Sequence, residues 1–296
     1  MLNILKHYLI KQGYIPLDKS WIIRMGILDL LNGYDDTTQF IKKQEQLSDD
    51  LKALYRASLA WKSDEPIDVG ESGTLYRFLR FASWKLDIDK EFILHGSLKQ
   101  REICDNPEIV NYSLDELLKL DNGTSQWASA SVLLGSKERI PNPPYKLRLS
   151  YEAVSHWKKQ RKKGHHWEPR YDETILRQAI AFLELLKKGE TSFIPQQPED
   201  YCFARAFELI TKEDGELRWP SLRGHESNRI AEMERVLCDT VVGKEINSRD
   251  HRIVQAIAML RKVKGKDIKV KYPEVVKKSW PQFWKFLKDS LNILIK

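Results

Sequence analysis

The stretch KSWIIRMGILDLL, residues 19–31, carries the pattern that decides the fold. Lys19 and Ser20 stand immediately before an apolar-periodic run, and polar residues followed by such a run predict the start of a helix. The pattern recurs along the chain at ESGTLYR (71–77), TSQ (124–126), DYC (200–202), ESNR (226–229) and DHR (250–252). The sequence therefore predicts helices that begin at these six points.

The six predicted helix starts also indicate an anion-binding site. A helix N-terminus presents unpaired N–H groups and a partial positive charge, which attract anions. Arg24, Arg77 and Arg229 fall in predicted first turns, where a cation opposes the helix dipole. A bound anion would relieve that conflict, and several such arginines in one chain favour a shared site.

Each of these residues, taken singly, has a simpler structural interpretation. Ser20, Thr124 and Asp200 are ordinary N-cap residues. Arg77 and Arg252 would serve equally well as surface ion-pair partners. Only the set as a whole favours the functional interpretation.

The composition is that of a globular protein. With 296 residues the chain is long enough for one or two domains, and its contents of 42% hydrophobic and 31% charged residues are ordinary. No apolar run reaches transmembrane length, and the N-terminal segment lacks the core and cleavage site of a signal peptide. Cys104, Cys202 and Cys238 form no CxxC pair, so neither a disulfide framework nor a zinc site is indicated. We therefore expect a cytoplasmic protein.

The net charge of +7, with a pI of about 9.1, is compatible with nucleic-acid binding. Two basic stretches stand out, KKQRKKGHH (158–166) and RKVKGKDIKVK (261–271). No helix-turn-helix pattern, zinc finger or aromatic-rich RNA motif accompanies them. We therefore interpret them as solvated faces or linkers, and expect the excess charge to serve small polyanionic substrates.

Short stretches typical of strands alternate with the predicted helices. They are EFILHGS (91–97), YKLRLSY (145–151), GELRWPSL (215–222) and DIKVKYP (267–273). This alternation predicts an α/β fold, and no Gly-rich nucleotide-binding motif is present. The polar, basic segment 157–170 is the expected crossing between two domains.

A series of motifs spread from Pro16 to Phe283 carries a resemblance to a known family. The motifs are PLDKSWIIR, ESGTLYRFL, SLKQREI, TSQWASASVLL, PPYKLRLS, PED, HESNRIAEM, RDHRIVQAIA and VKKSWPQF. In this order they resemble the enolpyruvyl transferases, and most closely the 5-enolpyruvylshikimate-3-phosphate synthases. Each motif is short, so the specificity lies in the ordered series.

The resemblance implies two lobes, each built from βαβαββ repeat units with helices inside and sheets outside. Residues 19–164 would form the lobe that holds shikimate 3-phosphate. Residues 1–18 and 165–296 would form the second lobe, with the active site in the cleft between the two. Because the chain is shorter than is usual for the family, we expect repeat units to be shortened or missing.

The resemblance also implies a reaction. The enolpyruvyl group of phosphoenolpyruvate would pass to the 5-hydroxyl of shikimate 3-phosphate with release of phosphate, a step of aromatic amino acid biosynthesis. This chemistry needs cations for the phosphates and carboxylates, a proton donor for the methylene carbon and a base for the hydroxyl. We expect no cofactor or metal, no nucleic-acid or membrane partner, and a monomer whose partners are the two small anionic substrates.

Individual residues take their expected roles from the same resemblance. The catalytic positions are Lys19, Asp200 and Glu226, with the two carboxylates as acid and base. The positions that match phosphoenolpyruvate contacts are Lys19, Gly73, Arg101, Arg229, Arg252 and Lys278. The positions that match shikimate 3-phosphate contacts are Ser20, Arg24, Thr124, Ser125, Gln126 and Tyr145. Further expected substrate-binding residues are Thr74, Arg77 and His225. Because Asp200 and Glu226 are expected at helix starts, replacing either with its amide should cost little stability.

Several positions depart from the family's usual pattern. His225 stands where lysine is typical, and a neutral imidazole would hold phosphate less firmly than an ammonium group. Glu71, Glu102 and Asn142 replace the usual Asn, Pro and Ser. The branch that acts on UDP-N-acetylglucosamine matches less well, because it has Asn where Ser20 stands. Two alternatives stay open: a divergent paralogue with another hydroxyl acceptor, and a non-catalytic ligand-binding descendant.

Overall fold

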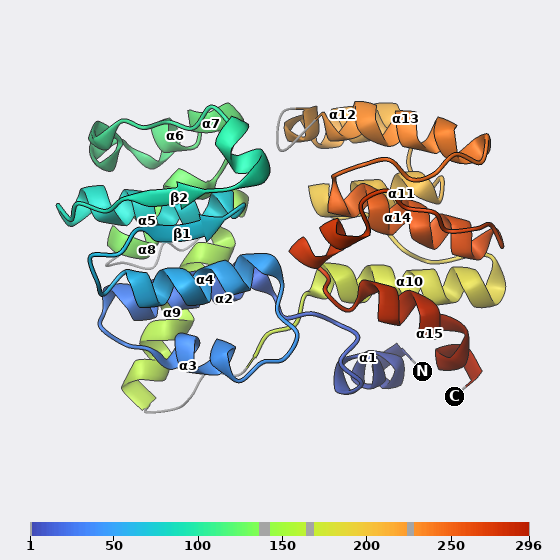
Figure 1. Ribbon diagram of the computed structural model, residues 1–296, viewed down its shortest axis with the longest axis horizontal. Coiled ribbons are helices and arrows are strands. Elements are labelled where there is room, and N and C mark those ends of the chain that lie inside the picture. The colour runs from blue at the N-terminus through green and yellow to red at the C-terminus, as the bar shows by residue number, and fades with distance from the viewer. Residues whose placement is uncertain (1, 136–142, 164–168, 224–227, 296) are drawn as a thin grey trace. The chain divides into compact units, whose positions relative to one another are not determined.

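The computed structural model describes residues 2–135, 143–163, 169–223 and 228–295 (Figure 1). The chain forms two compact units. We call Leu17–Arg170 the inserted unit, and Met1–Pro16 together with Tyr171–Lys296 the split unit. The chain therefore crosses from one unit to the other after residues 16 and 170, whereas the resemblance implied crossings after residues 18 and 164.

The inserted unit combines helices with one short parallel sheet. Its elements are α2 (Lys19–Leu31), α3 (Asp36–Lys42), α4 (Asp49–Ala60), β1 (Ile67–Gly70), α5 (Gly73–Lys85), β2 (Phe92–Leu94), η1 (Gly96–Gln100), η2 (Pro107–Asn111), α6 (Leu114–Leu117), α7 (Leu120–Gly123), α8 (Gln126–Gly135), η3 (Tyr145–Leu147) and α9 (Arg148–Lys163). Strands β1 and β2 pair in parallel, with Ile67 opposite Phe92, and α5 connects them as a βαβ unit. Ile22 of α2, Phe78 of α5 and Trp127 of α8 are fully buried in the core of this unit.

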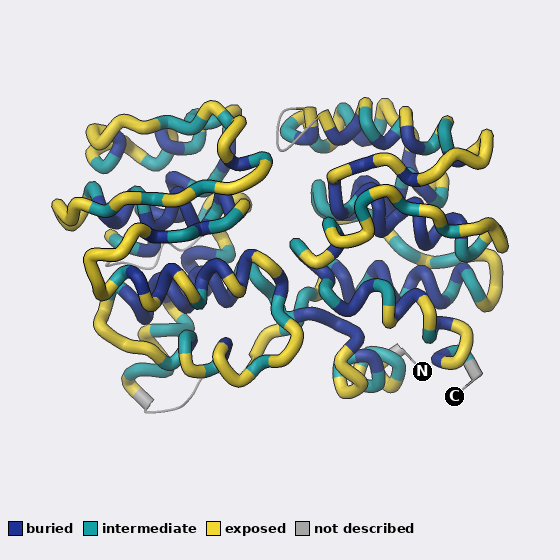
Figure 2. Tube along the Cα trace, viewed as in Figure 1, coloured by how far each residue is buried: buried dark blue, intermediate teal, exposed yellow. Residues whose placement is uncertain are grey.

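The split unit is built from helices. Its elements are α1 (Leu2–Lys11), α10 (Glu173–Lys188), η4 (Pro198–Asp200), α11 (Tyr201–Ala206), α12 (Lys212–Arg218), η5 (Pro220–Arg223), α13 (Arg229–Val241), α14 (His251–Val263), η6 (Pro273–Lys278) and α15 (Phe283–Ile295). Pairing between strands in its described part is limited to isolated bridges such as that between Ile246 and Val270. Phe182 of α10, Ile257 of α14 and Phe286 of α15 are fully buried in its core. Helix α4 buries one side and exposes the other, as Figure 2 shows, whereas residues 21–30 of α2 are all buried.

All six predicted helix starts are confirmed, because α2, α5, α8, α11, α13 and α14 each begin within the quoted clusters. Local capping explains three of them. Asp18 accepts the backbone N–H of Trp21 at 3.0 Å, and Asn228 and Asp250 cap α13 and α14 in the same way. Asp18, and not Ser20, is therefore the N-cap of α2.

The predicted α/β class holds only in a broad sense, because the described residues are mostly helical and form a single pair of strands. Of the predicted strand stretches, 91–97 contains β2. Residues 145–151 instead form η3 and the start of α9, and residues 215–222 form the end of α12 and most of η5. Residues 267–273 contain the bridge at Val270 and the first residue of η6. The segment 157–170, expected as a crossing, is helical as far as Lys163.

The helix at 148–163 was missed because its apolar spacing is ambiguous over a short window. Leu147, Tyr151 and Val154 are buried at positions i, i+4 and i+7, which is the spacing of one helix face. Over seven residues the same letters alternate well enough to suggest a strand. No helix in the described ranges is both long and apolar enough to cross a membrane.

Candidate functional site

The starts of α5 and α8 are joined through one side-chain amide. Gln126, the first residue of α8, donates from Nε2 to Thr74 Oγ1 (2.8 Å) and accepts at Oε1 from Arg77 Nη1 (2.8 Å). Helix α2 joins the same group, because the Arg24 guanidinium lies over the Phe78 ring at 5.4 Å. The structure thus brings three of the predicted helix starts together in the inserted unit, and we call this the three-helix cluster.

Arg24 is a buried arginine that has no carboxylate partner among the described residues. It is 7% exposed, and its guanidinium donates to Ser150 Oγ (2.9 Å) and to the Ser20 carbonyl (2.7 Å). Burial lowers the pKa of Arg24 to about 10, and the charge of Asp18 partly offsets that effect. A buried cation of this kind is costly unless an anion binds to it.

Arg77, by contrast, carries its own counterion. Its Nε lies 2.6 Å from Asp121 Oδ2, and both side chains are 6% exposed. Asp121 also accepts the Trp127 indole N–H and the Cys104 backbone N–H, each at 2.9 Å. Burial lowers the pKa of Arg77, and the charge of Asp121 opposes that shift. Asp121 therefore fixes the guanidinium in a network that does not depend on a ligand.

Gly73 lets two guanidinium groups approach the N-terminus of α5. A Cβ atom on Gly73 would lie 2.9 Å from Arg77 Nη1 and 3.1 Å from Arg101 Nη1. Arg101 also donates to Ser97 Oγ at 3.1 Å, and Ser97 in turn pairs with Glu71. Two cations thus border a helix N-terminus, which is the environment that binds phosphate and carboxylate groups.

Lys19, the predicted catalytic lysine, forms an ion pair with Asp50. The Nζ to Oδ2 distance is 2.5 Å, and Asp50 lies in the first turn of α4. Both side chains are largely buried, at 19% and 10% exposure. An incoming anion would therefore compete with the Asp50 carboxylate for the ammonium group.

The remaining predicted contacts for shikimate 3-phosphate divide into two groups. Thr124 and Ser125 directly precede α8, and the Thr124 hydroxyl accepts the Gln126 N–H at 3.4 Å, so both residues belong to the three-helix cluster. Tyr145 is 68% exposed at the start of η3, and its ring faces the Arg148 guanidinium at 5.8 Å. The next residue, Lys146, donates from Nζ to the Gly123 carbonyl at 3.4 Å, which places η3 beside the segment before α8.

In the split unit, Asp200 is fully buried and surrounded by hydrogen-bond donors. Its Oδ2 accepts from Arg177 Nη2 (2.7 Å) and from the backbone N–H groups of Gln196 (2.9 Å) and Gln197 (3.3 Å). Its Oδ1 accepts from Gln178 Nε2 at 3.1 Å. Each of these four groups donates a hydrogen bond to the carboxylate. In this conformation Asp200 organises the chain around it, and it does not present itself as an acid or base.

This environment also corrects the structural interpretation of Asp200. The residue precedes α11, but its side chain does not cap that helix. The expectation that Asp200→Asn costs little stability assumes that Asp200 is an ordinary carboxylate at a helix start. That assumption is wrong. Asp200 is 0% exposed, and its partners come from α10 and from the segment before η4.

The starts of α13 and α14 are joined by an ion pair. Arg229 Nε lies 2.7 Å from Asp250 Oδ2, with the side chains 7% and 3% exposed, while Asp250 Oδ1 caps α14. Arg252, in the first turn of α14, reaches the Glu199 carbonyl at 3.5 Å. Burial raises the pKa of the Cys202 thiol to about 12, and the charges of Arg229 and Arg252 only partly oppose that shift. The thiol is therefore no nucleophile.

Lys278, His225 and Glu226 complete the set of predicted site residues. Lys278 is the last residue of η6, and the residue after it, Ser279, accepts from Gln255 Nε2 of α14 at 3.1 Å. The end of η6 is thereby held against α14. His225 and Glu226 lie outside the described residues.

Arg177, Gln178, Asp121 and Asp50 are not among the predicted site residues, although the sequence carries a signal for the first two. The stretch DETILRQ, residues 172–178, repeats the pattern of a cap followed by an apolar run with an arginine. Asp172 does cap α10, because its Oδ1 accepts the backbone N–H of Ile175 at 2.9 Å. The stretch is a further member of the set of helix starts.

The chemistry available to the described residues is the binding of anions by guanidinium and ammonium groups at helix starts. No group of three or more His, Cys, Asp and Glu side chains in the described part of the chain is placed to hold a metal ion. Comparison with known proteins gives no family for this geometry, since no family model, curated protein or solved structure matches the chain.

Proposed function

We propose that this protein transfers the enolpyruvyl group of phosphoenolpyruvate to the 5-hydroxyl of shikimate 3-phosphate and releases phosphate. The observation that carries the proposal is Arg24, a buried guanidinium with no carboxylate partner among the described residues. It lies against α5, at whose start Arg77 and Arg101 border Gly73. Arginine is suited to this role because its planar fork binds phosphate and carboxylate groups bidentately.

The proposal divides the work between two sets of residues. The three-helix cluster, with Ser20, Thr124, Ser125 and Gln126 beside its arginines, would bind shikimate 3-phosphate. Cations matched to phosphoenolpyruvate are Lys19, Arg101, Arg229, Arg252 and Lys278. Because Asp200 is engaged by four donors, acid and base chemistry would fall on Glu226 unless the segment around Asp200 rearranges.

We also propose that the two units are reduced relatives of the βαβαββ lobes of enolpyruvyl transferases. Support comes from the β1–α5–β2 unit, which is a parallel βαβ connection, and from the helix starts that lie within or directly after the matched motifs. The short strands and the mostly helical content are what loss of repeat units would leave.

A second candidate is a non-catalytic protein that binds the same anions. The engaged carboxylate of Asp200 favours it, because a general acid or base must reach the reacting group. Three ion pairs favour it as well, since they neutralise cations that an enzyme would use: Lys19–Asp50, Arg77–Asp121 and Arg229–Asp250.

Phosphate release from a mixture of phosphoenolpyruvate and shikimate 3-phosphate, with each substrate alone as a control, tests the transferase. Release that requires both substrates supports it. Calorimetric binding of both without release supports the second candidate. If neither substrate binds at millimolar concentration, both candidates fail.

A further inference from the structure

The network around Asp200 assigns a role to a residue outside the matched motifs. We propose that Arg177 is a positioning residue, which holds the segment 193–200 in place through Asp200 and thereby directs the Arg252 guanidinium. The inference rests on the proposed function in one respect, namely that Arg252 binds phosphoenolpyruvate.

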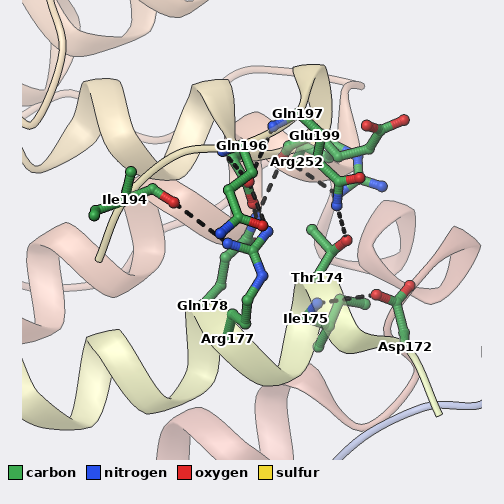
Figure 3. Close-up of polar contacts among 11 residues, drawn as sticks. Asp172, Thr174, Ile175, Arg177, Gln178, Ile194, Gln196, Gln197, Glu199 and Arg252 are labelled. Carbon is green, nitrogen blue, oxygen red and sulfur yellow. Dashed lines mark hydrogen bonds and ion pairs between the residues drawn. The ribbon is translucent and has the colours of Figure 1, made fainter. Parts of the chain in front are cut away.

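Arg177 fastens the segment at two points. Its Nη2 forms the 2.7 Å ion pair with Asp200, and its Nη1 donates to the Ile194 carbonyl at 3.4 Å. The guanidinium also lies over the Phe193 ring at 5.3 Å. Figure 3 shows the side chain rising from α10 toward the stretch that carries Ile194, Gln196 and Glu199. One rigid group thus fixes both ends of a segment that lacks regular structure before η4.

Gln178 holds the Glu199 carbonyl in place through a hydrogen bond. Its Nε2 donates to Asp200 Oδ1 (3.1 Å) and to Glu199 O (3.2 Å). Gln197 adds a hydrogen bond from Nε2 to Thr174 Oγ1, in the first turn of α10. The position of the Glu199 carbonyl is therefore set from α10 by several side chains that converge on it or on its neighbours.

The Glu199 carbonyl is also the described contact of Arg252. The Nη1 to oxygen distance of 3.5 Å is the longest in the network, so the carbonyl orients the guanidinium without binding it tightly. An arginine has five N–H donors, so most of them stay available for a ligand. Fixing one of them reduces the conformational freedom that ligand binding would otherwise have to restrict.

The test uses Arg177→Met in the full chain, with Arg235→Met as a matched control. Arg235 is a half-exposed arginine of α13 in the same unit, and it pairs with Asp239 at 3.2 Å. In the wild type and in the control, the NMR signal of the Arg252 Nε–H group should report one ordered side chain. In Arg177→Met we expect that signal to shift and broaden, and the exchange of the Gln196 and Gln197 amide protons to accelerate.

Phosphoenolpyruvate affinity, measured by calorimetry, provides the second readout. Loss of a partner that orients a binding side chain costs about 10-fold to 100-fold at metal sites, and we expect about tenfold weaker binding in Arg177→Met. In an Arg252→Met background, adding Arg177→Met should change the affinity no further, because its effect passes through Arg252. A purely structural role would lower stability and leave the affinity of the folded protein unchanged.

The outcomes separate this inference from the proposed function. Absence of phosphoenolpyruvate binding to the wild type would defeat the function, whereas the Arg252 signal would still decide the positioning role. An Arg252 signal identical in wild type and folded Arg177→Met would overturn the inference, as would additive effects on affinity. If Arg177→Met does not fold, the double variant Arg177→Met/Asp200→Asn, which removes both charges of the ion pair, replaces it. The Arg252 signal and the phosphoenolpyruvate affinity are then measured on the double variant.

Discussion

At the scale of single residues, the arginines of the described site differ in what neutralises them. Arg77 and Arg229 each have a buried aspartate, Asp121 and Asp250, within 2.7 Å. Such pairs orient the guanidinium whether or not a ligand is present, and removing either partner would leave an uncompensated buried charge. Arg24 has only neutral hydrogen-bond partners in the described structure. The cost of burying its charge therefore either lowers the stability of the protein or is offset by a bound anion.

Replacing Arg24 with methionine should therefore change the stability of the ligand-free protein only modestly and remove anion binding. The pKa of about 10 indicates a penalty on the order of 3 kcal/mol for the buried charge, since one pH unit corresponds to about 1.4 kcal/mol. The lost hydrogen bonds to Ser150 and Ser20 oppose the gain from removing that charge, because a hydrogen bond to a charged group contributes about 1.5–3 kcal/mol. We therefore expect the free energy of unfolding, measured by urea denaturation, to fall by no more than about 3 kcal/mol, with no calorimetric binding of shikimate 3-phosphate.

The control for this variant is Arg56→Met, which removes a half-exposed arginine of α4 from its 3.3 Å ion pair with Asp68. It should change the free energy of unfolding by less than about 1 kcal/mol and leave binding intact. Arg24→Met protein that binds shikimate 3-phosphate as tightly as the wild type would show that Arg24 is only structural.

Asp200→Asn should destabilise the protein strongly, by about 3–5 kcal/mol, the usual cost of breaking a buried ion pair from one side. The amide nitrogen would face N–H donors, and Arg177 would lose its counterion. Comparing the thermal unfolding of Asp200→Asn with that of Asp200→Asn/Arg177→Met tests whether the unpaired Arg177 charge is the cause. If it is, the double variant should recover part of the lost stability. Wild-type stability in the single variant would mean that Asp200 is not engaged as described.

At the scale of elements, the helix starts could be predicted because each depends on residues close together in sequence. Asp18 and Asn228 cap helices whose first turns follow directly. The strands could not be separated from helices by short apolar patterns, so 145–151 was assigned to the wrong class. The environment of Asp200 could not be predicted either, since Arg177 and Gln178 belong to another helix and meet it only through tertiary packing.

Gly73→Ala tests whether the start of α5 is an anion site. The backbone of Gly73 does not have a positive φ, so alanine can adopt its conformation, but the free energy of unfolding should fall by about 1–3 kcal/mol because the buried Arg77 guanidinium has to move. The added methyl group would displace the Arg77 and Arg101 guanidinium groups that lie within 3.1 Å of it. Losing one hydrogen bond to a charged group costs about 1.5–3 kcal/mol, so anion affinity should fall about tenfold or more.

Gly135→Ala is the matched control, because Gly135 ends α8 and a methyl group there would meet nothing within 4 Å. Its affinity for shikimate 3-phosphate and for phosphoenolpyruvate should equal that of the wild type. Equal affinities for both substrates in Gly73→Ala would remove the start of α5 from the proposed site.

At the scale of the whole molecule, the inserted unit has the features of a domain that can fold alone. Its two ends meet, since the Asp18 N–H donates to the Arg170 carbonyl at 2.7 Å and the Arg170 guanidinium lies over the Trp21 ring at 5.0 Å. It also has its own core around Phe78 and Trp127. Adjacent ends and a separate core are what an inserted domain requires.

The two sequence segments of the split unit are joined by hydrogen bonds. The Asp172 N–H donates to the Pro16 carbonyl at 2.9 Å, and the Trp280 indole N–H donates to the Tyr14 carbonyl at 2.7 Å. Tyr14 also donates to Asp289 at 2.9 Å. The first sixteen residues are thus held by the C-terminal part of the chain, which explains how a unit made from two sequence segments keeps one core.

A fragment of residues 17–170 should therefore unfold cooperatively and bind shikimate 3-phosphate without the rest of the chain. A domain of about 150 residues buries about 68–70% of the surface that its unfolded chain exposes, which is enough for an independent core. Because Arg24, Arg77, Thr124 and Gln126 all belong to this fragment, its affinity for shikimate 3-phosphate should lie within about tenfold of that of the full chain, a difference of about 1.4 kcal/mol. Urea denaturation and calorimetry check both points, with the Arg24→Met fragment as the control that should fold but not bind. A folded fragment with no affinity for shikimate 3-phosphate, beside a full chain that binds it, would show that the three-helix cluster is not sufficient for binding.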